Sequence, residues 1–559
     1  MKYVIIGGVA GGATTAARLR RLDEQCEIVM FEKGEHISYA NCGLPYYIGD
    51  KITEKKVLLL QTPVSFGNRY DVDVRVRSEV TAIHPERKTV SVRNLMNNKE
   101  YEESYDKLVL SPGALPIVPP IPGVDSKRIF TLRNVLDTER IKQFVTATYS
   151  SLKEVVVVGA GFIGLEMVEN LHQLGYHVTI VEKAPQVMTV VDAPIAATVH
   201  KQLKDKQINL ILQTEVAGFD TLEDRIKIIL SDGKQLEADF VILSIGVRPN
   251  TSWAADAGLK IGDAGGIWVN EYLQTSNPDI YALGDAIEFP HPLSGLSYCC
   301  YLAGPANRQA RICADNLVLG NTEKYGGSIA TAIAKVFDLT VGSTGLSEHY
   351  LQKNHIPYLT SITHPFSHAT YYPGAKQMSI KLNFSPDNGR VLGAQIVGEE
   401  GVDKRLDLMA SVISRGGNIS DLIDIEHAYA PPFSSAKESV AYAAYVAENI
   451  LTHRVVPIHW HELKAIFEKK NWQDEYFLLD VRSAMEVKNG MIEGAVNYPV
   501  DELREFVEEI PEDKKIIVYC AVGMRGYIAS RILMQSGFNQ VYNLSGGYKT
   551  YRLMLETLL

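Results

Sequence analysis

Short, almost purely apolar runs recur along this chain, and two of them lead directly into glycine-rich loops. Residues 3–6 precede the first loop, which is followed by a helix-like run at 13–22 and a second apolar run at 27–31. Residues 155–158 and 177–181 repeat this order around a second loop. Short apolar runs that alternate with helical segments are typical of buried parallel strands. The pattern predicts repeated βαβ units.

The first loop and the acidic residue after it form a candidate dinucleotide site. The acid Glu32, followed by Lys33, ends the second strand, where a ribose would be held. The pyrophosphate would meet backbone N–H groups at the helix start. The loop residues are Gly7, Gly8, Val9, Ala10, Gly11 and Gly12. Because Val9 replaces the usual middle glycine, a glycine-rich turn without a ligand stays an alternative for this copy.

The second loop carries the complete glycine fingerprint. Its strand is followed by Glu182, whose carboxylate can accept both ribose hydroxyls but would repel a 2′-phosphate. This favours NADH over NADPH, although nearby Lys183 would soften the preference and NADPH stays possible. The loop residues that we expect to contact the cofactor are Gly159, Gly161, Phe162, Ile163 and Gly164.

Further motifs follow in a fixed order along the chain. Ser111-Pro112-Gly113 and residues 244–250 each follow an apolar strand, as crossings between two nucleotide domains would, and a later strand ends in Gly284-Asp285. With these motifs the chain resembles the flavoprotein disulfide reductases that have two dinucleotide domains. The resemblance implies that the first fold holds FAD, the inserted fold holds the nicotinamide, and Asp285 binds the ribityl chain.

Pro305 is a further candidate cofactor residue. It could begin a helix at 306–319, because proline is favoured at a first helical position. The positive end of that helix would stabilise an anionic reduced flavin. An ordinary helix start explains the proline equally well.

Size, charge and cysteine content narrow the class of protein. A chain of 559 residues is expected to form about three to five compact units. The net charge of -10 argues against nucleic acid or anionic lipid as partners, and no apolar run approaches the length of a membrane span. The first residues enter the glycine loop rather than a cleavable signal. Six cysteines without paired spacing indicate neither a disulfide framework nor a metal site, so we expect a reducing cytoplasm.

Cys42 is the sharpest local signal. Many members of the resembled family have two cysteines in the segment that corresponds to residues 38–46, whereas this chain has one. Its disulfide partner would come from outside, or its oxidised form would be a sulfenate or persulfide; a buried structural thiol is the alternative. Residues 38–46 resemble the single-cysteine branch of coenzyme A-disulfide reductases, NADH oxidases and NADH peroxidases. The oxidases and peroxidases carry a histidine where this chain has Ala10, so coenzyme A fits better.

A set of residues near Cys42 could hold coenzyme A. Arg18 and Arg21 share a helix face at i, i+3 spacing and could bind its phosphates. For each arginine alone, a solvated surface charge is the simpler interpretation. The other members of the set are Ser38, Asn41, Gln61, Thr62, Phe66 and Arg69.

Residues 322–450 resemble the dimerisation domain that the family places over the partner's active site, which implies a homodimer with shared sites. The segments around Tyr371 and Tyr429 look like those that supply two active-site tyrosines in coenzyme A-disulfide reductases. A phenol there could protonate a departing thiolate. Of the adjacent residues Tyr371 and Tyr372, Tyr372 could equally be the one that faces the active site.

The last segment, after residue 456, restarts as a separate α/β unit that resembles a rhodanese domain. Met491 replaces the family's frequent histidine, but the catalytic loop is intact. Cys520 ends a strand and opens a loop into a helix, where backbone N–H groups and Arg525 can stabilise a thiolate or persulfide. The other cysteines, Cys26, Cys299, Cys300 and Cys313, are expected to be small buried hydrophobes.

The predicted fold class is α/β, with two Rossmann-like dinucleotide-binding domains, an α+β dimerisation domain and a C-terminal α/β rhodanese domain. The expected limits are 1–112 with 243–321 for FAD, 113–242 for NAD(P)H, 322–450 for dimerisation and 456–559 for rhodanese.

Three functions are compatible with these motifs. In the first, NADH and FAD serve Cys42, which reduces coenzyme A persulfide, polysulfide or coenzyme A disulfide, by way of a mixed disulfide with coenzyme A, and Cys520 transfers sulfane sulfur. The second is an NADH oxidase or peroxidase that uses a Cys42 sulfenate. The third is a sulfur- or redox-sensing binding protein without turnover.

Overall fold

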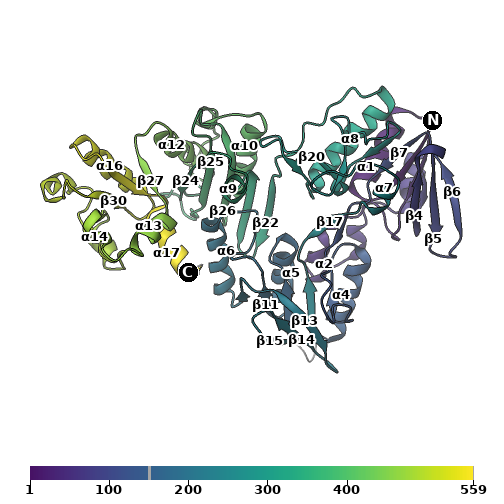
Figure 1. Cartoon of the computed structure of the whole chain (residues 1–559), viewed down its shortest axis with the longest axis horizontal. Coiled ribbons are helices and arrows are strands. Elements are labelled where there is room, and N and C mark those ends of the chain that lie inside the picture. Colours follow the sequence, from purple (N-terminus) through teal and green to yellow (C-terminus); the bar gives the residue numbers. More distant parts are fainter. Residues whose placement is uncertain (149–152, 558–559) are drawn as a thin grey trace. The chain divides into compact units, whose positions relative to one another are not determined.

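A computed structural model describes residues 1–148 and 153–557 of the chain (Figure 1). The chain divides into two compact units. The first comprises residues 1–183 and 208–330, and the second comprises 184–207 and 331–559. None of the described helices is both long enough and apolar enough to cross a membrane.

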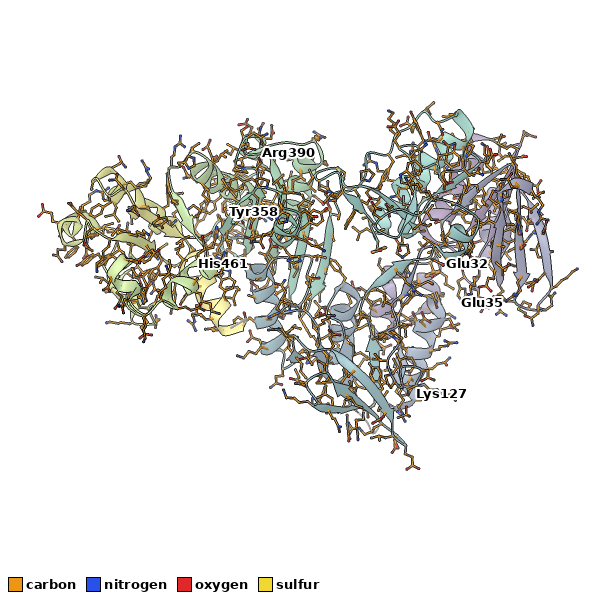
Figure 2. All side chains as sticks on the ribbon, viewed as in Figure 1. Glu32, Glu35, Lys127, Tyr358, Arg390 and His461 are labelled. Atoms are coloured by element: carbon orange, nitrogen blue, oxygen red, sulfur yellow. The ribbon has the colours of Figure 1, made fainter. Side chains whose placement is uncertain are left out.

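The first unit contains a five-stranded parallel sheet in the order β19-β7-β1-β2-β3. Strands β1, β2, β7 and β19 are largely buried because helices cover the sheet, whereas the edge strand β3 is partly exposed; α1 packs against α8. Glu32, labelled in Figure 2, follows the last residue of β2. The element bounds are β1 Lys2–Ile6, β2 Glu27–Phe31, β3 Asp73–Arg75, β7 Lys107–Leu110, β19 Ile280–Ala282, α1 Ala10–Leu22 and α8 Ala303–Leu319.

A second parallel sheet in this unit has the order β12-β11-β10-β16-β9. The two connections between the sheets pair as an antiparallel ribbon of β8 and β17, in agreement with the crossings expected from the sequence. The bounds are β8 Ala114–Pro116, β9 Ile129–Phe130, β10 Glu154–Val158, β11 His177–Val181, β12 Asn209–Ile211, β16 Phe240–Leu243, β17 Val247–Pro249, α4 Val135–Thr148 and α5 Phe162–Gln173.

Antiparallel strands add two smaller sheets to the first unit. Each contains three strands, in the orders β4-β5-β6 and β13-β14-β15. Their bounds are β4 Ser78–His84, β5 Thr89–Asn94, β6 Glu100–Ser104, β13 Val216–Thr221, β14 Ile226–Leu230 and β15 Gln235–Ala238.

The second unit contains a five-stranded antiparallel sheet in the order β22-β23-β26-β25-β24. Strands β25 and β26 are buried along their whole length, because α6, α10 and α12 all pack in this region. The bounds are β22 Ala332–Val336, β23 Leu339–Gly345, β24 Leu359–Thr363, β25 Ser379–Phe384, β26 Val391–Gly398, α6 Ala193–Asp205, α10 Val402–Ser414 and α12 Ser439–Leu451.

The same unit ends in a five-stranded parallel sheet in the order β27-β31-β30-β28-β29 (Figure 1). The three parallel sheets and the five-stranded antiparallel sheet confirm the predicted fold class. The bounds are β27 Val456–Ile458, β28 Tyr476–Asp480, β29 Val496–Asn497, β30 Lys515–Tyr519, β31 Val541–Leu544, α13 Trp460–Phe467, α15 Ala484–Val487, α16 Met524–Gln535 and α17 Gly547–Thr557.

Two local expectations were wrong. Helix α8 begins at Ala303 rather than after Pro305, so the proline is the third helical residue. A proline is tolerated there because the N–H groups of the first turn have no partner within the helix. Cys299 is only partly buried, whereas Cys26, Cys300 and Cys313 are buried as expected. Cys299 and Cys300 are neighbours in the loop after the short strand β21, Ser297–Tyr298, and of the two it is Cys300 whose side chain packs into the core.

Candidate active site

The first glycine loop requires glycine at both of its ends. Gly7 has φ +98°, a conformation that side-chain-bearing residues rarely adopt. A Cβ atom on Gly12 would lie 1.8 Å from the carbonyl oxygen of Gly7, so the helix can approach the strand only without one. The N–H of Gly8 donates to the Glu32 carboxylate at 2.9 Å. This geometry joins the loop to the acid at the end of β2.

The second glycine loop repeats this arrangement. Gly159 has φ +97°, and a Cβ on Gly164 would lie 2.1 Å from the Gly159 carbonyl oxygen. The N–H of Ala160 donates to Glu182 at 2.7 Å. A Cβ on the middle glycine, Gly161, would meet no atom within 4 Å. The fold itself therefore leaves the middle position of the second loop open, so a requirement for glycine there would come from the ligand.

Both loops fit a dinucleotide. Each places backbone N–H groups at the start of a helix, where the helix dipole favours a phosphate, and holds an acid at the adjacent strand end for a ribose. The neighbouring lysines are paired elsewhere in the first unit. Lys33 lies 2.7 Å from Glu79, and Lys183 lies 2.8 Å from Glu215.

Asp285 lies in a short 3-10 turn, Gly284–Ala286, directly after β19. Its carboxylate accepts a hydrogen bond from Arg133 at 2.6 Å. Gly284 has φ +76°, and its N–H donates to Gln309 of α8 at 2.7 Å. A Cβ on Gly113 would approach the Arg133 guanidinium to 3.1 Å. The Gly-Asp turn, the first crossing and α8 therefore meet around this carboxylate.

Other predicted cofactor residues lie beside the first loop. The side-chain oxygen of Ser111 would be 2.5 Å from a Cβ on Gly11, so the serine packs directly on the loop. Pro305 lies in the first turn of α8, and α8 packs along α1, the helix that the loop starts.

Cys42 lies in a 3-10 turn, Asn41–Gly43, just before the short helix α2, Leu44–Ile48. The residue is exposed. Surrounding protein atoms nevertheless desolvate the thiol in part and raise its pKa, and the charges of Glu166 and Asp285 raise it further. Arg133 acts in the opposite direction and lowers this pKa. The reactivity of Cys42 thus depends on charged side chains contributed by several segments of the first unit.

Glu166 of α5 is the second titratable group near Cys42. Burial raises its pKa to about 7, and the nearby Glu169 contributes in the same direction. Tyr46 donates a hydrogen bond to this carboxylate, which opposes the rise. A carboxyl with such a pKa can take up or release a proton near neutral pH.

The second unit brings Tyr371 and Tyr429 together. Their hydroxyl oxygens are 2.7 Å apart, and the two side chains are 74% and 49% exposed. Tyr372 instead packs its ring edge against His368. The structure thus places Tyr371, and not Tyr372, beside Tyr429, on the surface of the antiparallel-sheet region.

Cys520 follows the last residue of β30 and precedes α16. The residue is buried, and its sulfur accepts a hydrogen bond from the N–H of Gly523 at 3.1 Å. Gly523 has φ +108°, which turns the loop so that α16 can begin. The geometry suits a thiolate or persulfide held by backbone donors.

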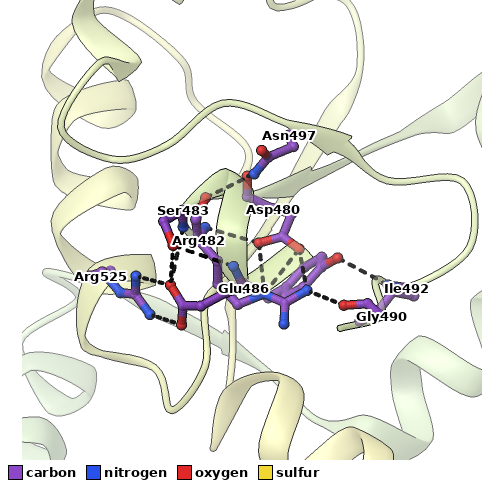
Figure 3. Close-up of polar contacts among 9 residues, drawn as sticks. Asp480, Arg482, Ser483, Glu486, Gly490, Ile492, Asn497 and Arg525 are labelled. Carbon is purple, nitrogen blue, oxygen red and sulfur yellow. Dashed lines mark hydrogen bonds and ion pairs between the residues drawn. The ribbon is translucent and has the colours of Figure 1, made fainter. Parts of the chain in front are cut away.

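Arg525 is fixed by Glu486 through two hydrogen bonds of 2.6 and 2.7 Å (Figure 3). This pairing lowers the pKa of Glu486 to about 2. The hydrogen bond to Glu486 raises the pKa of Arg525, and a negative charge on Cys520 and a hydrogen bond to its sulfur act in the same direction, so the guanidinium also lies close to the sulfur. Behind it, Arg482 makes a buried ion pair with Asp480 at 2.6 Å.

Comparison with known proteins decides the family. The sequence pattern described as pyridine nucleotide-disulphide oxidoreductase matches residues 1–305, more than half of the chain. The chain belongs to this family. The family's dimerisation domain matches residues 331–441, and a rhodanese-like domain matches residues 459–553. As a member, the chain is an oxidoreductase that uses FAD and a pyridine nucleotide.

Individual relatives agree with this assignment. A coenzyme A disulfide reductase of Staphylococcus aureus (strain bovine RF122 / ET3-1) is 36% identical over 447 residues, which are 80% of this chain and 100% of that protein. The crystal structure of reduced CoADR-RHD from Bacillus anthracis is 47% identical, with a TM-score of 0.96, and covers 100% of this chain and 98% of its own. A NAD-dependent persulfide reductase from A. fulgidus is 36% identical, with a TM-score of 0.90, covering 99% and 100%.

The structure also shows what the residues chosen for coenzyme A do within the fold. The Arg18 guanidinium bonds Asp315 of α8 at 2.8 Å, while Arg21 and Arg69 are exposed. Phe66 is 3% exposed and belongs to the hydrophobic core that includes strands β1 and β2. Thr62 caps the helix at Pro63–Tyr70. Gln61, Ser38 and Asn41 are partly buried nearby. Coenzyme A binding by this set stays a prediction. The side chain of Phe66 is packed among buried core residues.

Sequence reasoning missed Arg133 and Glu166. Arg133 precedes α4 in an unremarkable segment, 152 residues from Asp285. Glu166 follows the second glycine loop by two positions, so the sequence could have shown that it lies near the start of a cofactor-binding helix. The sequence could not have shown that Glu166 lies close to Cys42, because this depends on how α2 packs against α5.

Proposed function

We propose that this family member uses NADH to reduce coenzyme A persulfide, polysulfide or coenzyme A disulfide through Cys42, and that Cys520 carries the sulfane sulfur. The observation that carries the proposal is an exposed Cys42 that forms no disulfide with any described cysteine. A thiol without an internal partner is free to exchange with a sulfur brought by a substrate. The relatives named above, a coenzyme A disulfide reductase and a NAD-dependent persulfide reductase, support this choice.

Glu182 supports NADH as the reductant. Its carboxylate lies at the strand end after the second loop, where it would repel a 2′-phosphate. Lys183, which would have softened this preference, is engaged by Glu215.

The chemistry at Cys42 follows from its surroundings. When bound, FAD would carry the reducing equivalents of NADH to Cys42. Two electrons from NADH open a disulfide between Cys42 and coenzyme A, which frees the Cys42 thiolate and releases coenzyme A. The thiolate then attacks a substrate sulfur, so that a new S–S bond forms at Cys42 while the substrate's S–S bond breaks. The leaving group, which is a thiolate from a disulfide or sulfide from a persulfide, takes a proton.

Tyr371 and Tyr429 are the proposed source of that proton. Each phenol bonds the other, so a proton lost from one can be replaced through its neighbour. The match to the dimerisation domain supports a homodimer in which the tyrosine pair of each subunit serves the active site of the other. The high exposure of both side chains in the single chain agrees with this arrangement.

The first test identifies the small thiol that leaves Cys42. The purified protein is reduced anaerobically with NADH, and the released thiols are measured by mass spectrometry, with Cys42→Ser as the control. Coenzyme A released only by the unmutated protein would support the proposal. A Cys42 sulfenate with no thiol released would instead favour an NADH oxidase or peroxidase.

A second test compares acceptors and examines the coupling to Cys520. NADH consumption is measured with coenzyme A persulfide, coenzyme A disulfide, oxygen and peroxide. We expect the sulfur substrates to be used fastest; absence of turnover with all four would favour a sensing protein. If Cys520→Ser leaves every sulfur-transfer and persulfide-reduction rate unchanged, Cys520 plays no part.

A further inference from the structure

The Cys520 loop is held from one side by the start of α17. The N–H of Tyr548 donates to the carbonyl of Cys520 at 2.8 Å, and the N–H of Lys549 donates to the carbonyl of Ala521 at 3.0 Å. Because these bonds join main-chain atoms of the loop to a helix terminus, they limit the movement of the loop. The position of the loop therefore depends on where α17 begins.

The same start of α17 is tied to the antiparallel-sheet region. The Lys549 ammonium donates to Gln377 at 2.6 Å, and Thr550 lies 2.8 Å from Nε2 of the buried His364. Burial lowers the pKa of Lys549 to about 8, so this lysine is largely removed from water. The rhodanese-like domain is thus joined to its neighbour directly behind its catalytic loop.

Helix α12 contacts the start of α16, the helix that the Cys520 loop opens. The hydroxyl of Tyr442 donates to the sulfur of Met524 at 3.7 Å, four residues beyond Cys520. About two helical turns further on, Asn449 lies 3.3 Å from the hydroxyl of Tyr527 on α16. Two residues of α12 therefore contact the first turn of the helix that the Cys520 loop opens.

The Tyr442 hydroxyl also lies within electrostatic reach of Cys520. Burial raises the pKa of Tyr442, and a negative charge on Cys520 raises it further. The phenol consequently keeps its proton at neutral pH and can act as a donor. A thioether sulfur such as that of Met524 is only a weak acceptor, so a sulfur anion would compete well for this donor.

A sulfur anion on Cys520 needs such donors. The structure provides the N–H of Gly523, and the Arg525 guanidinium is already shared with the Glu486 carboxylate (Figure 3). We propose that Tyr442, from outside the rhodanese-like domain, completes the Cys520 site by donating a hydrogen bond to the sulfur anion that Cys520 carries during transfer. This role rests on the proposed sulfur transfer at Cys520.

The reaction that tests this role uses thiosulfate as donor and cyanide as acceptor. The Cys520 thiolate attacks the outer sulfur of thiosulfate, a Cys520 S–S bond forms, and sulfite leaves with the electron pair of the broken S–S bond. Cyanide then takes the outer sulfur as thiocyanate and restores the thiolate. Neither step requires Cys42, so the measurement reports on the Cys520 site alone.

The informative variant is Tyr442→Phe in the full chain, because the ring and its packing are retained. Loss of one hydrogen bond to a charged sulfur should lower kcat for thiocyanate formation by about fivefold or more, with little change in the thiosulfate KM. Tyr445→Phe, on the exposed side of α12, is the matched control and should behave as the parent. Tyr442→Ala removes the packing of the ring as well as the hydroxyl, and the thermal unfolding of each variant shows whether its fold is retained. Together they separate the loss of a hydrogen bond from the loss of packing.

The outcomes are distinct. If Tyr442→Phe retains the parental kcat and only Tyr442→Ala is impaired, Tyr442 merely packs and the inference is overturned, while sulfur transfer at Cys520 stands. If the parent forms no thiocyanate above the Cys520→Ser background, both the proposed sulfur transfer and the role of Tyr442 are rejected. A lower kcat in Tyr442→Phe, with the control unchanged and unfolding temperatures equal, establishes the role.

Discussion

The Arg133 guanidinium bonds the Asp285 carboxylate at 2.6 Å, and the same arginine lowers the pKa of the Cys42 thiol. One cation thus links the Gly-Asp turn expected to bind the flavin with the cysteine expected to exchange sulfur. Asp285 and Glu166 oppose its effect on Cys42. Partial desolvation has the largest effect and raises the pKa of Cys42, and the balance of these charges then adjusts how readily the thiolate forms.

Removing Arg133 should make Cys42 less reactive. Arg133→Gln removes the positive charge but leaves the carboxylates of Asp285 and Glu166, so the pKa of Cys42 should rise. Alkylation of Cys42 near neutral pH should then slow by about tenfold. The measurement is the iodoacetamide reaction of Cys42 followed by peptide mass spectrometry across pH. Arg140→Gln, an exposed arginine of α4, is the control. Identical pH profiles for Arg133→Gln and the parent would refute the link.

Replacing Glu166 should have the opposite effect. Because the raised pKa of Glu166 is about 7, its carboxyl is neutral below this pH and charged above it, and the charged form raises the pKa of Cys42. In Glu166→Gln, Cys42 alkylation above neutral pH should therefore be faster, by about two- to tenfold, and an inflection near pH 7 should disappear. Glu166→Asp retains the charge and should keep the inflection. Loss of the inflection in Glu166→Asp as well would contradict its assignment to the Glu166 carboxyl.

Two glycines of the second loop should separate folding from cofactor binding. A Cβ on Gly164 meets the Gly159 carbonyl, so Gly164→Ala should lower the unfolding temperature and weaken NADH binding together. Gly161→Ala meets no atom in the fold and should unfold like the parent. It should still weaken NADH binding by about tenfold, because the pyrophosphate can no longer approach the backbone closely. Equal NADH affinity in Gly161→Ala and the parent would remove this loop from the cofactor site.

The tyrosine pair should contribute to turnover with sulfur substrates. Tyr429→Phe and Tyr371→Phe each remove one phenol of a bonded pair, so each should lower kcat, and the double variant should lose about a hundredfold. Tyr372→Phe, whose ring packs on His368, is the control and should keep the parental rate. NADH oxidation with coenzyme A disulfide provides the measurement. A double variant as fast as Tyr372→Phe would exclude a proton-transfer role.

The Glu486–Arg525 pair should make the rhodanese-like domain sensitive to acid. The folded pKa of Glu486, about 2, is lower than its ordinary value of 4.5, so the pair contributes stability above pH 4.5 that is lost as the pH falls toward 2. Because both side chains are about one-third exposed, the contribution should not exceed about 1 kcal/mol. Unfolding of Glu486→Gln and the parent, followed between neutral and acidic pH, should differ at neutral pH and converge in acid. A constant difference across this range would contradict the assignment.

Much of the fold follows from local sequence. Glycines at 7, 12, 159 and 164 are needed because backbone atoms approach closely there, and the apolar runs before them form buried parallel strands. Cys520 lies at the end of a strand and opens a loop into a helix, as the sequence indicated. The first turn of α8 was misplaced because the position of a proline within a first turn is not decided by the proline alone.

The sequence by itself determined which elements form and which residues carry chemistry, since periodicity, glycine requirement and residue type act over a few neighbouring positions. Only the tertiary structure decided the partners. Arg133 with Asp285, Tyr371 rather than Tyr372 beside Tyr429, and Tyr442 with Met524 at the start of α16 are contacts between segments far apart in the chain. Such contacts arise from the packing of whole helices and sheets, which no local pattern encodes.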